Sequence, residues 1–191
     1  LAPGSGVYCV QLSLGMRGRL DVAAFRRAWQ SVLDRHAALR TAFVWEGLDQ
    51  PLQIVRKQVE LPWRCEHGTD GHAEETQLAE FLRDDRSAGF DLSRAPLMRV
   101  ALLQTGDDEW RCVWTHHHLI LDGWSVGLVL QDGLACYVTI AGGGTPAWRP
   151  ARLRRRAREA RPRGGAPRAR CRSKAGRTAG APPPGEGPRA P

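Results

Sequence analysis

The feature that most limits how this chain can fold is a change of composition after residue 148. Residues 149–191 consist largely of Arg, Pro, Gly and Ala and contain almost no large apolar side chain. Such a segment cannot bury enough apolar surface to offset the chain entropy lost on folding. We therefore expect one folded domain in residues 1–148 and a disordered basic tail in residues 149–191.

The net charge of +8 arises from this tail and not from the expected domain. The tail holds 14 Lys and Arg against 2 Asp and Glu, whereas residues 1–148 hold 14 against 18. A mildly acidic body without a basic stripe is not typical of a nucleic-acid-binding domain. We expect no nucleic-acid partner for the domain. A tail that anchors the chain to nucleic acid or to an acidic surface stays open as an alternative.

The cysteines and the hydropathy pattern bear on the cellular compartment. The five cysteines form no CxxC pair, and their odd number leaves one thiol unpaired in any disulfide scheme, which favours a reducing environment. No apolar run approaches the roughly 20 residues that span a bilayer, and the first residues resemble no signal peptide. We predict a cytoplasmic protein without a membrane partner.

Strand and helix patterns interleave along the first 140 residues, which predicts an α/β domain with a mixed or antiparallel sheet flanked by helices. In chain order, the patterns predict a strand at 7–16, a helix from Asp21 to about His36, strands at 41–45 and 52–55, a helix at 74–86, a hairpin of strands at 97–104 and 110–116, and a helix capped by Ser125. The last helix should present one apolar face, made of Val126, Val129, Leu130, Leu134 and Tyr137.

The most informative stretch follows the predicted hairpin. Residues 116–123 read HHHLILDG, so imidazoles at the end of an apolar strand precede a carboxylate and a glycine. Because histidine titrates near neutral pH, an imidazole held in a cleft can take a proton from an incoming nucleophile or orient it. Spacing alone leaves two other interpretations open. The stretch can be an ordinary strand end, or His116, His118 and Asp122 can be ligands of a metal site that lacks a fourth nearby ligand.

Two ordered motifs resemble a known family. THHHLILDGWS at residues 115–125 resembles the HHxxxDG motif of condensation domains of non-ribosomal peptide synthetases, within the chloramphenicol-acetyltransferase-like superfamily. RHAALRTAF at residues 35–43 resembles the RHxxLRTxF motif of the same family, and the resemblance spans nearly all of residues 1–140. It implies a lobe of the chloramphenicol-acetyltransferase-like fold.

The resemblance assigns roles to individual residues. His118 matches the second histidine of the motif, which the family uses to position or deprotonate the acceptor amine that attacks a donor thioester. His117, Asp122 and Gly123 match supporting positions, with Gly123 allowing a tight turn. By the same resemblance, Asp122 should form an ion pair with Arg35 or Arg40 of the upstream motif, Arg35 being favoured.

The same resemblance implies partners that the chain does not contain. Complete condensation domains pair two lobes around the histidine motif and receive substrates on the 4'-phosphopantetheine arms of carrier proteins. The expected partners are upstream and downstream carrier domains, neighbouring adenylation domains and a C-terminal lobe that is missing here. The family implies no metal and no cofactor bound by the domain itself. We interpret the chain as an N-terminal lobe truncated at both ends, which should be inactive alone.

The tail departs from the family pattern. Residues 152–154 read RLR where the family usually carries a YxDFAxW-like segment, and a one-base shift in suitable codons would begin Asp-Tyr-Ala. We expect the tail to be a frameshift product, and a genuine arginine-rich linker is the alternative. Alternatives for the function are a related HHxxxDG acyltransferase, an epimerisation domain, or a non-catalytic fragment that docks carrier proteins.

Overall fold

The computed structural model describes residues 8–67 and 73–148. The predictions of tail disorder and of a frameshift therefore lie outside the described residues. The elements are β1 (Cys9–Arg17), α1 (Val22–Arg35), a short 3-10 helix η1 (Ala37–Arg40), β2 (Thr41–Val44), β3 (Leu52–Val55), β4 (Trp63–His67), α2 (Ala73–Ala88), β5 (Met98–Gly106), β6 (Glu109–His117) and α3 (Gly123–Ala141).

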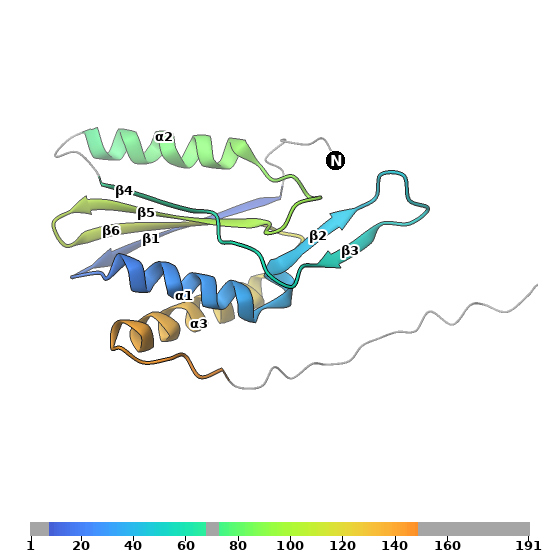
Figure 1. Ribbon diagram of the computed structural model, residues 1–191. Coiled ribbons are helices and arrows are strands. Elements are labelled where there is room, and N and C mark those ends of the chain that lie inside the picture. The colour runs from blue at the N-terminus through green and yellow to red at the C-terminus, as the bar shows by residue number, and fades with distance from the viewer. Residues whose placement is uncertain (1–7, 68–72, 149–191) are drawn as a thin grey trace, which may run out of the picture. The chain divides into compact units, whose positions relative to one another are not determined.

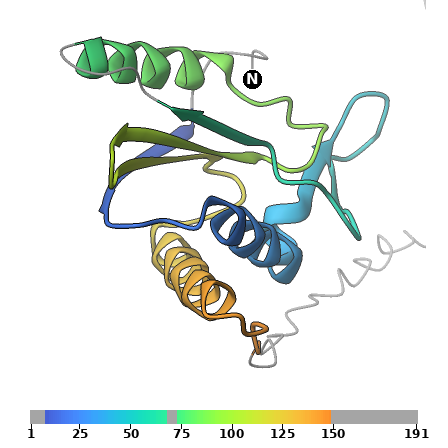
Figure 2. The same ribbon diagram turned by 60° about the vertical axis from the view of Figure 1, so that its left-hand side comes forward.

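Helices cover both faces of a four-stranded sheet in the order β1-β6-β5-β4 (Figures 1 and 2). α2 lies on one face, and α1 and α3 lie on the other. β6 is antiparallel to both β1 and β5, whereas β4 runs parallel to β5 at the edge. β2 and β3 form a separate antiparallel pair. The predicted class, an α/β domain with a mixed sheet and flanking helices, is confirmed.

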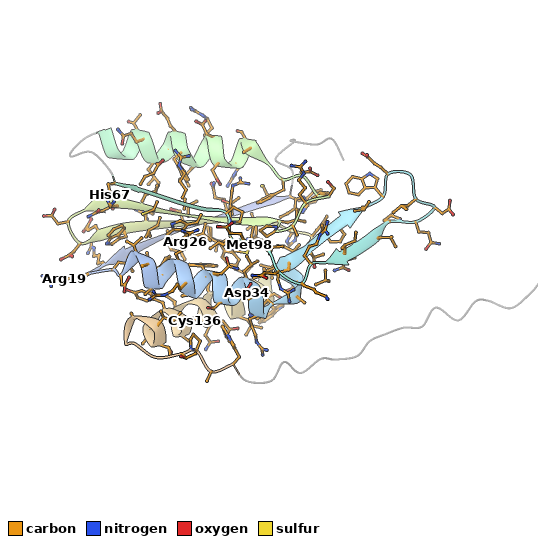
Figure 3. The ribbon with its side chains drawn as sticks, in the orientation of Figure 1. Arg19, Arg26, Asp34, His67, Met98 and Cys136 are labelled. Atoms are coloured by element: carbon orange, nitrogen blue, oxygen red, sulfur yellow. The ribbon has the colours of Figure 1, made fainter. Side chains whose placement is uncertain are left out.

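The main core lies between the sheet and α1. Asp21 begins α1 by accepting a hydrogen bond from Ala24 N at 2.9 Å, as predicted. The predicted apolar face of α1 is buried, and Trp29 meets Trp114 of β6 with ring centroids 5.1 Å apart. Met98 of β5 is fully buried near the centre of the molecule, whereas exposed Arg19 points away from it (Figure 3).

A smaller apolar cluster joins α2 to the opposite face of the sheet. Leu78, Phe81 and Leu82 of the predicted surface helix pack against Ala101 and neighbouring strand residues. The helix ends one residue before Gly89, which has a φ of +57°. This left-handed conformation confirms the predicted role of that glycine, because residues with a Cβ atom rarely adopt it.

Three predictions of local structure need correction. β4 is absent from the predicted elements, because its alternating sequence WRCEH is only five residues long and gives a weak strand signal. Tyr8 does not belong to the first strand, because its φ is +67° and it precedes β1. α3 is capped by Asp122 and not by Ser125, because Asp122 Oδ1 accepts a hydrogen bond from Ser125 N at 2.8 Å.

α3 is also more apolar on its outer side than predicted. Leu134, expected on the buried face, is 57% exposed, and Trp124 and Val138 are exposed as well. By length and composition alone, the 19 residues of α3 would suffice to cross a membrane, which corrects the expectation that no segment reaches this length. A single such helix is weak evidence for a membrane span, and α3 packs its inner residues Val129 and Cys136 in the domain.

Candidate active site

β6 ends with His116 and His117, and His118 follows directly after the strand. The amide of His117 donates to Leu97 O at 2.9 Å, and the amide of His118 donates to Tyr8 O at 2.8 Å. The strand is therefore held on both sides up to the point where it leaves the sheet. A turn follows, in which Ile120 N donates to His117 O at 3.2 Å. The position of the histidine pair is thus set by backbone hydrogen bonds from two directions.

His116 lies in the interior. Its side chain is 0% exposed, its ring packs against Trp114 at a centroid distance of 4.7 Å, and neither ring nitrogen has a hydrogen-bond partner among the described residues. Burial, with smaller effects of the neighbouring histidines, lowers the pKa of His116 to about 4. The imidazole is therefore neutral at physiological pH and is directed into the core and not toward solvent.

His117 is buried on the opposite side of the strand, where Tyr8 and Phe90 flank its ring at centroid distances of 6.3 and 6.4 Å. Its Nδ1 accepts a hydrogen bond from Leu119 N at 3.2 Å. Nδ1 therefore carries no hydrogen, and the neutral ring is protonated on Nε2. Burial, followed by the charge of His118, lowers the pKa of His117 and favours this neutral form.

Of the adjacent residues His117 and His118, His118 is the exposed one. Its Nδ1 lies 3.0 Å from Leu121 O, and because a carbonyl oxygen only accepts, Nδ1 carries the hydrogen. The neutral imidazole therefore has its lone pair on Nε2, which is the atom that a general base uses. Of the three histidines, His118 alone is exposed with its tautomer set in this way.

Asp122 has a structural role that the family resemblance does not imply. Its carboxylate caps α3 through Ser125 N, and the hydrogen bonds from Ser125 lower the pKa of Asp122 below its usual value. Arg40 donates to the carbonyls of Arg56 and Lys57, and the Arg35 guanidinium lies 5.7 Å from the centroid of the Trp148 ring.

The carboxylate of Asp122 thus has a partner at the start of α3, and its ion pair with Arg35 or Arg40 stays a prediction. A free amide at the start of α3 is a natural partner for a carboxylate, because the first turn of a helix has unpaired N–H groups and a partial positive charge. Gly123 differs from expectation. It has no positive φ, and a Cβ atom there would meet none of the described residues within 4 Å, so the turn does not require glycine.

Replacing Asp122 with asparagine distinguishes its helix-capping role from a role in an ion pair, because asparagine can cap a helix but carries no charge. Asparagine caps helices as well as aspartate does, so Asp122→Asn should leave the melting temperature nearly unchanged, whereas Asp122→Ala should lower it by about 2–4 °C. Thermal unfolding followed by circular dichroism measures both. An equal loss in the two variants would show that the charge of Asp122, and hence an ion pair, is what stabilises the chain.

The metal interpretation gains no support from the geometry. Within residues 8–67 and 73–148, no three His, Cys, Asp or Glu side chains converge as ligands. His116 is enclosed in the core while His118 is exposed, so the two rings do not share a site.

Two polar contacts are absent from the predictions made on the sequence. His36 Nε2 lies 2.8 Å from a carboxylate oxygen of Asp132, which ties the end of α1 to α3. Asp85 of α2 pairs with Arg99 of β5, and both side chains are largely buried. A charged residue inside the apolar run of residues 97–103 is the available signal for Arg99, since a buried cation needs a partner.

Comparisons with known proteins identify the family and the fold of the chain. The family model described as the condensation domain matches residues 1–151. This chain belongs to the condensation domain family. The family prediction made from the two motifs is confirmed.

The related sequences come from non-ribosomal peptide synthetases. One of the linear gramicidin synthase proteins of Brevibacillus parabrevis is 46% identical over 144 residues, which are 73% of this chain and 3% of that protein. Chondramide synthase cmdD of Chondromyces crocatus is 42% identical over 134 residues, which are 70% of this chain and 3% of that protein. The condensation domain described here thus matches a small part of each of these proteins.

The solved structures show the same fold over a similar span. The starter condensation domain of rhizomide synthetase RzmA is 25% identical with a TM-score of 0.69, covering 76% of this chain and 36% of that one. A crystal structure of the SgcC5 protein from Streptomyces globisporus is 24% identical with a TM-score of 0.64, and it covers 78% of this chain and 34% of that one. The chain spans about a third of the length of these solved structures.

Proposed function

We propose that this chain supplies the histidine-bearing lobe of a condensation domain that joins two carrier-tethered acyl or aminoacyl thioesters through an amide bond. The observation that carries the proposal is the state of His118. Its ring is exposed at the end of β6, and the hydrogen bond from Nδ1 to Leu121 O leaves Nε2 as the acceptor. An exposed Nε2 acceptor can accept a hydrogen bond or a proton from the amine of an acceptor substrate.

In the proposed reaction, the nitrogen of the acceptor amine attacks the carbonyl carbon of the donor thioester. A C–N bond forms and the C–S bond breaks, and the donor carrier leaves as a free thiol. His118 Nε2 orients the amine or takes the proton that the nitrogen loses on attack. The departing thiolate takes up one proton and becomes the free thiol, so the proton lost by the amine is accounted for. The proposed step requires no metal ion and no nucleotide.

The proposed substrates arrive on 4'-phosphopantetheine arms of carrier domains upstream and downstream, because the related proteins are large peptide synthetases. Adenylation domains are the expected neighbours in such a protein. The further partner is the remainder of the condensation domain, since this chain spans about a third of the solved ones. We propose that the lobe is inactive alone, in a cytoplasmic synthetase.

The test is amide formation between two loaded carrier proteins, followed by mass spectrometry of the product thioester. We compare the full chain alone, the chain with a separately expressed C-terminal lobe, and that lobe alone. Product from the mixture only is the expected result, because the histidine motif and the second lobe must meet. A folded, associated mixture that forms no product would overturn the proposal and favour a carrier-docking fragment, which would bind a carrier without turnover.

A further inference from the structure

The carboxylate of Asp85 gathers polar side chains from three adjacent strands beneath the end of α2. It accepts hydrogen bonds from Gln11 of β1 at 2.7 Å, Thr115 of β6 at 2.5 Å and Arg99 of β5 at 2.5 Å. Burial opposes its ionisation, but the hydrogen bonds from Arg99, Thr115 and Gln11 outweigh burial and lower the pKa of Asp85. The site thus holds an ionised, largely buried pair of Asp85 and Arg99.

A buried ion pair contributes little net stability, because the desolvation of both charges offsets their attraction. Its value lies in the geometry that it maintains. Arg99 also donates to the carbonyls of Gly89 and Asp85, so several bonds hold its planar guanidinium in one orientation. That group lies over the ring of Phe90, with 4.4 Å between the guanidinium carbon and the ring centroid. The pair therefore fixes the position of Phe90.

Phe90 in turn contacts the first histidine of the motif. The rings of Phe90 and His117 meet nearly at right angles, at 87° and a centroid distance of 6.4 Å. The ring of His117 also meets the ring of Tyr8 and accepts the hydrogen bond from Leu119 N. A contiguous line of contacts therefore runs from Asp85 through Arg99 and Phe90 to His117.

His117 and His118 are linked by the turn that follows them. The Leu119 amide is held by His117 Nδ1, and two residues later the carbonyl of Leu121 sets the tautomer of His118. If the ring of His117 rotates, the Leu119 amide loses its acceptor, and the turn that presents Leu121 O loses one of the hydrogen bonds that hold it, although the bond from Ile120 N to His117 O remains. The orientation of His118 therefore depends on the orientation of His117.

We propose that Asp85, Arg99 and Phe90 are positioning residues for His118 and act on it through His117. The catalytic meaning of this inference rests on the proposed function. None of the three touches the reacting atoms in this assignment. The competing explanation is that the Asp85–Arg99 pair only fastens α2 to the sheet, and that Phe90 only fills space.

The two explanations differ in what happens to the imidazoles. Imidazole ¹⁵N shifts report which ring nitrogen carries the hydrogen, and they are measured on the full ¹⁵N-labelled chain without any partner. In the unmodified chain, we expect Nδ1–H for His118 and Nε2–H for His117. In Arg99→Met, both rings should shift toward a mixture of tautomers, and Arg99→Lys should restore part of the signal because it returns a cation above Phe90.

Phe90→Leu is the decisive variant, because it leaves Asp85 and Arg99 in place and so keeps α2 fastened. The expected result is an altered His117 tautomer at nearly unchanged stability. Arg83→Met is the matched control, since Arg83 lies on α2 with an exposed side chain and should leave both imidazoles unchanged. Unaltered tautomers in both Phe90→Leu and Arg99→Met, whatever happens to the melting temperature, would overturn the inference.

Activity supplies an independent readout. In the domain reconstituted with its second lobe, Phe90→Leu should lower kcat about 10-fold to 100-fold, because a small displacement of a catalytic group has effects of this size. The KM for the carriers should not change, since these residues lie away from any carrier contact in the proposal. Should the reconstituted domain form no product at all, the proposed function fails, and the ¹⁵N spectra still decide the positioning role.

Discussion

Replacing His118 with alanine should lower the rate of amide formation in the reconstituted domain by about 10²-fold to 10⁴-fold, the range typical of a general base. The structure gives the reason. His118 is exposed at the end of β6, and the hydrogen bond of its Nδ1 to Leu121 O leaves the Nε2 lone pair available to the acceptor amine. Alanine removes that lone pair and leaves the buried neighbours in place. Single-turnover product formation with preloaded carriers measures the loss.

His67→Ala is the matched control for this experiment. His67 is an exposed histidine at the end of β4, and its ring contacts Gln104 and not the motif. It should retain full activity. If His118→Ala kept the unmodified rate while the chain stayed folded, His118 would have no part in the chemistry, and the assignment of this site as catalytic would be wrong.

The second large effect concerns stability in acid. His116→Leu should remove most of the loss of folding free energy between pH 6.5 and pH 4. Burial lowers the pKa of His116 from an ordinary 6.5 to about 4, so in this window the unfolded chain binds a proton that the folded chain excludes. Stability is fully present above pH 6.5 and falls as the pH drops toward 4. The difference amounts to about 3 kcal/mol.

Urea unfolding of the full chain at pH 7 and at pH 4.5 measures this effect. Leucine has a volume close to that of histidine and leaves no polar atom unpaired, so His116→Leu should also be the more stable chain at pH 7. The exposed His67→Leu variant should keep the acid sensitivity of the unmodified chain. Parallel pH dependences of the unmodified chain and His116→Leu would mean that water or a partner reaches the His116 ring in solution.

Most of the fold could be predicted from the sequence, because its signals are local. The cap at Asp21 and the spacing of apolar residues that follows it specify α1, and the hairpin of β5 and β6 follows from two apolar runs around a polar turn. β4 could not be predicted in this way. As an edge strand parallel to β5, it depends on a partner more than 30 residues away in the sequence, and its own alternating pattern is only five residues long.

The candidate site, like the fold, was partly predictable from the sequence and partly decided by tertiary contacts. The sequence by itself determined the family, through two motifs in a fixed order, and it predicted His118 as the residue most suited to the chemistry. Only the tertiary structure decided that three adjacent histidines have three different environments, because a strand alternates its side chains between the two faces of the sheet and then ends. It also decided that Asp122 caps a helix, and that Arg99 reaches the motif through Phe90. Those contacts join residues that are distant in sequence, and no local pattern specifies them.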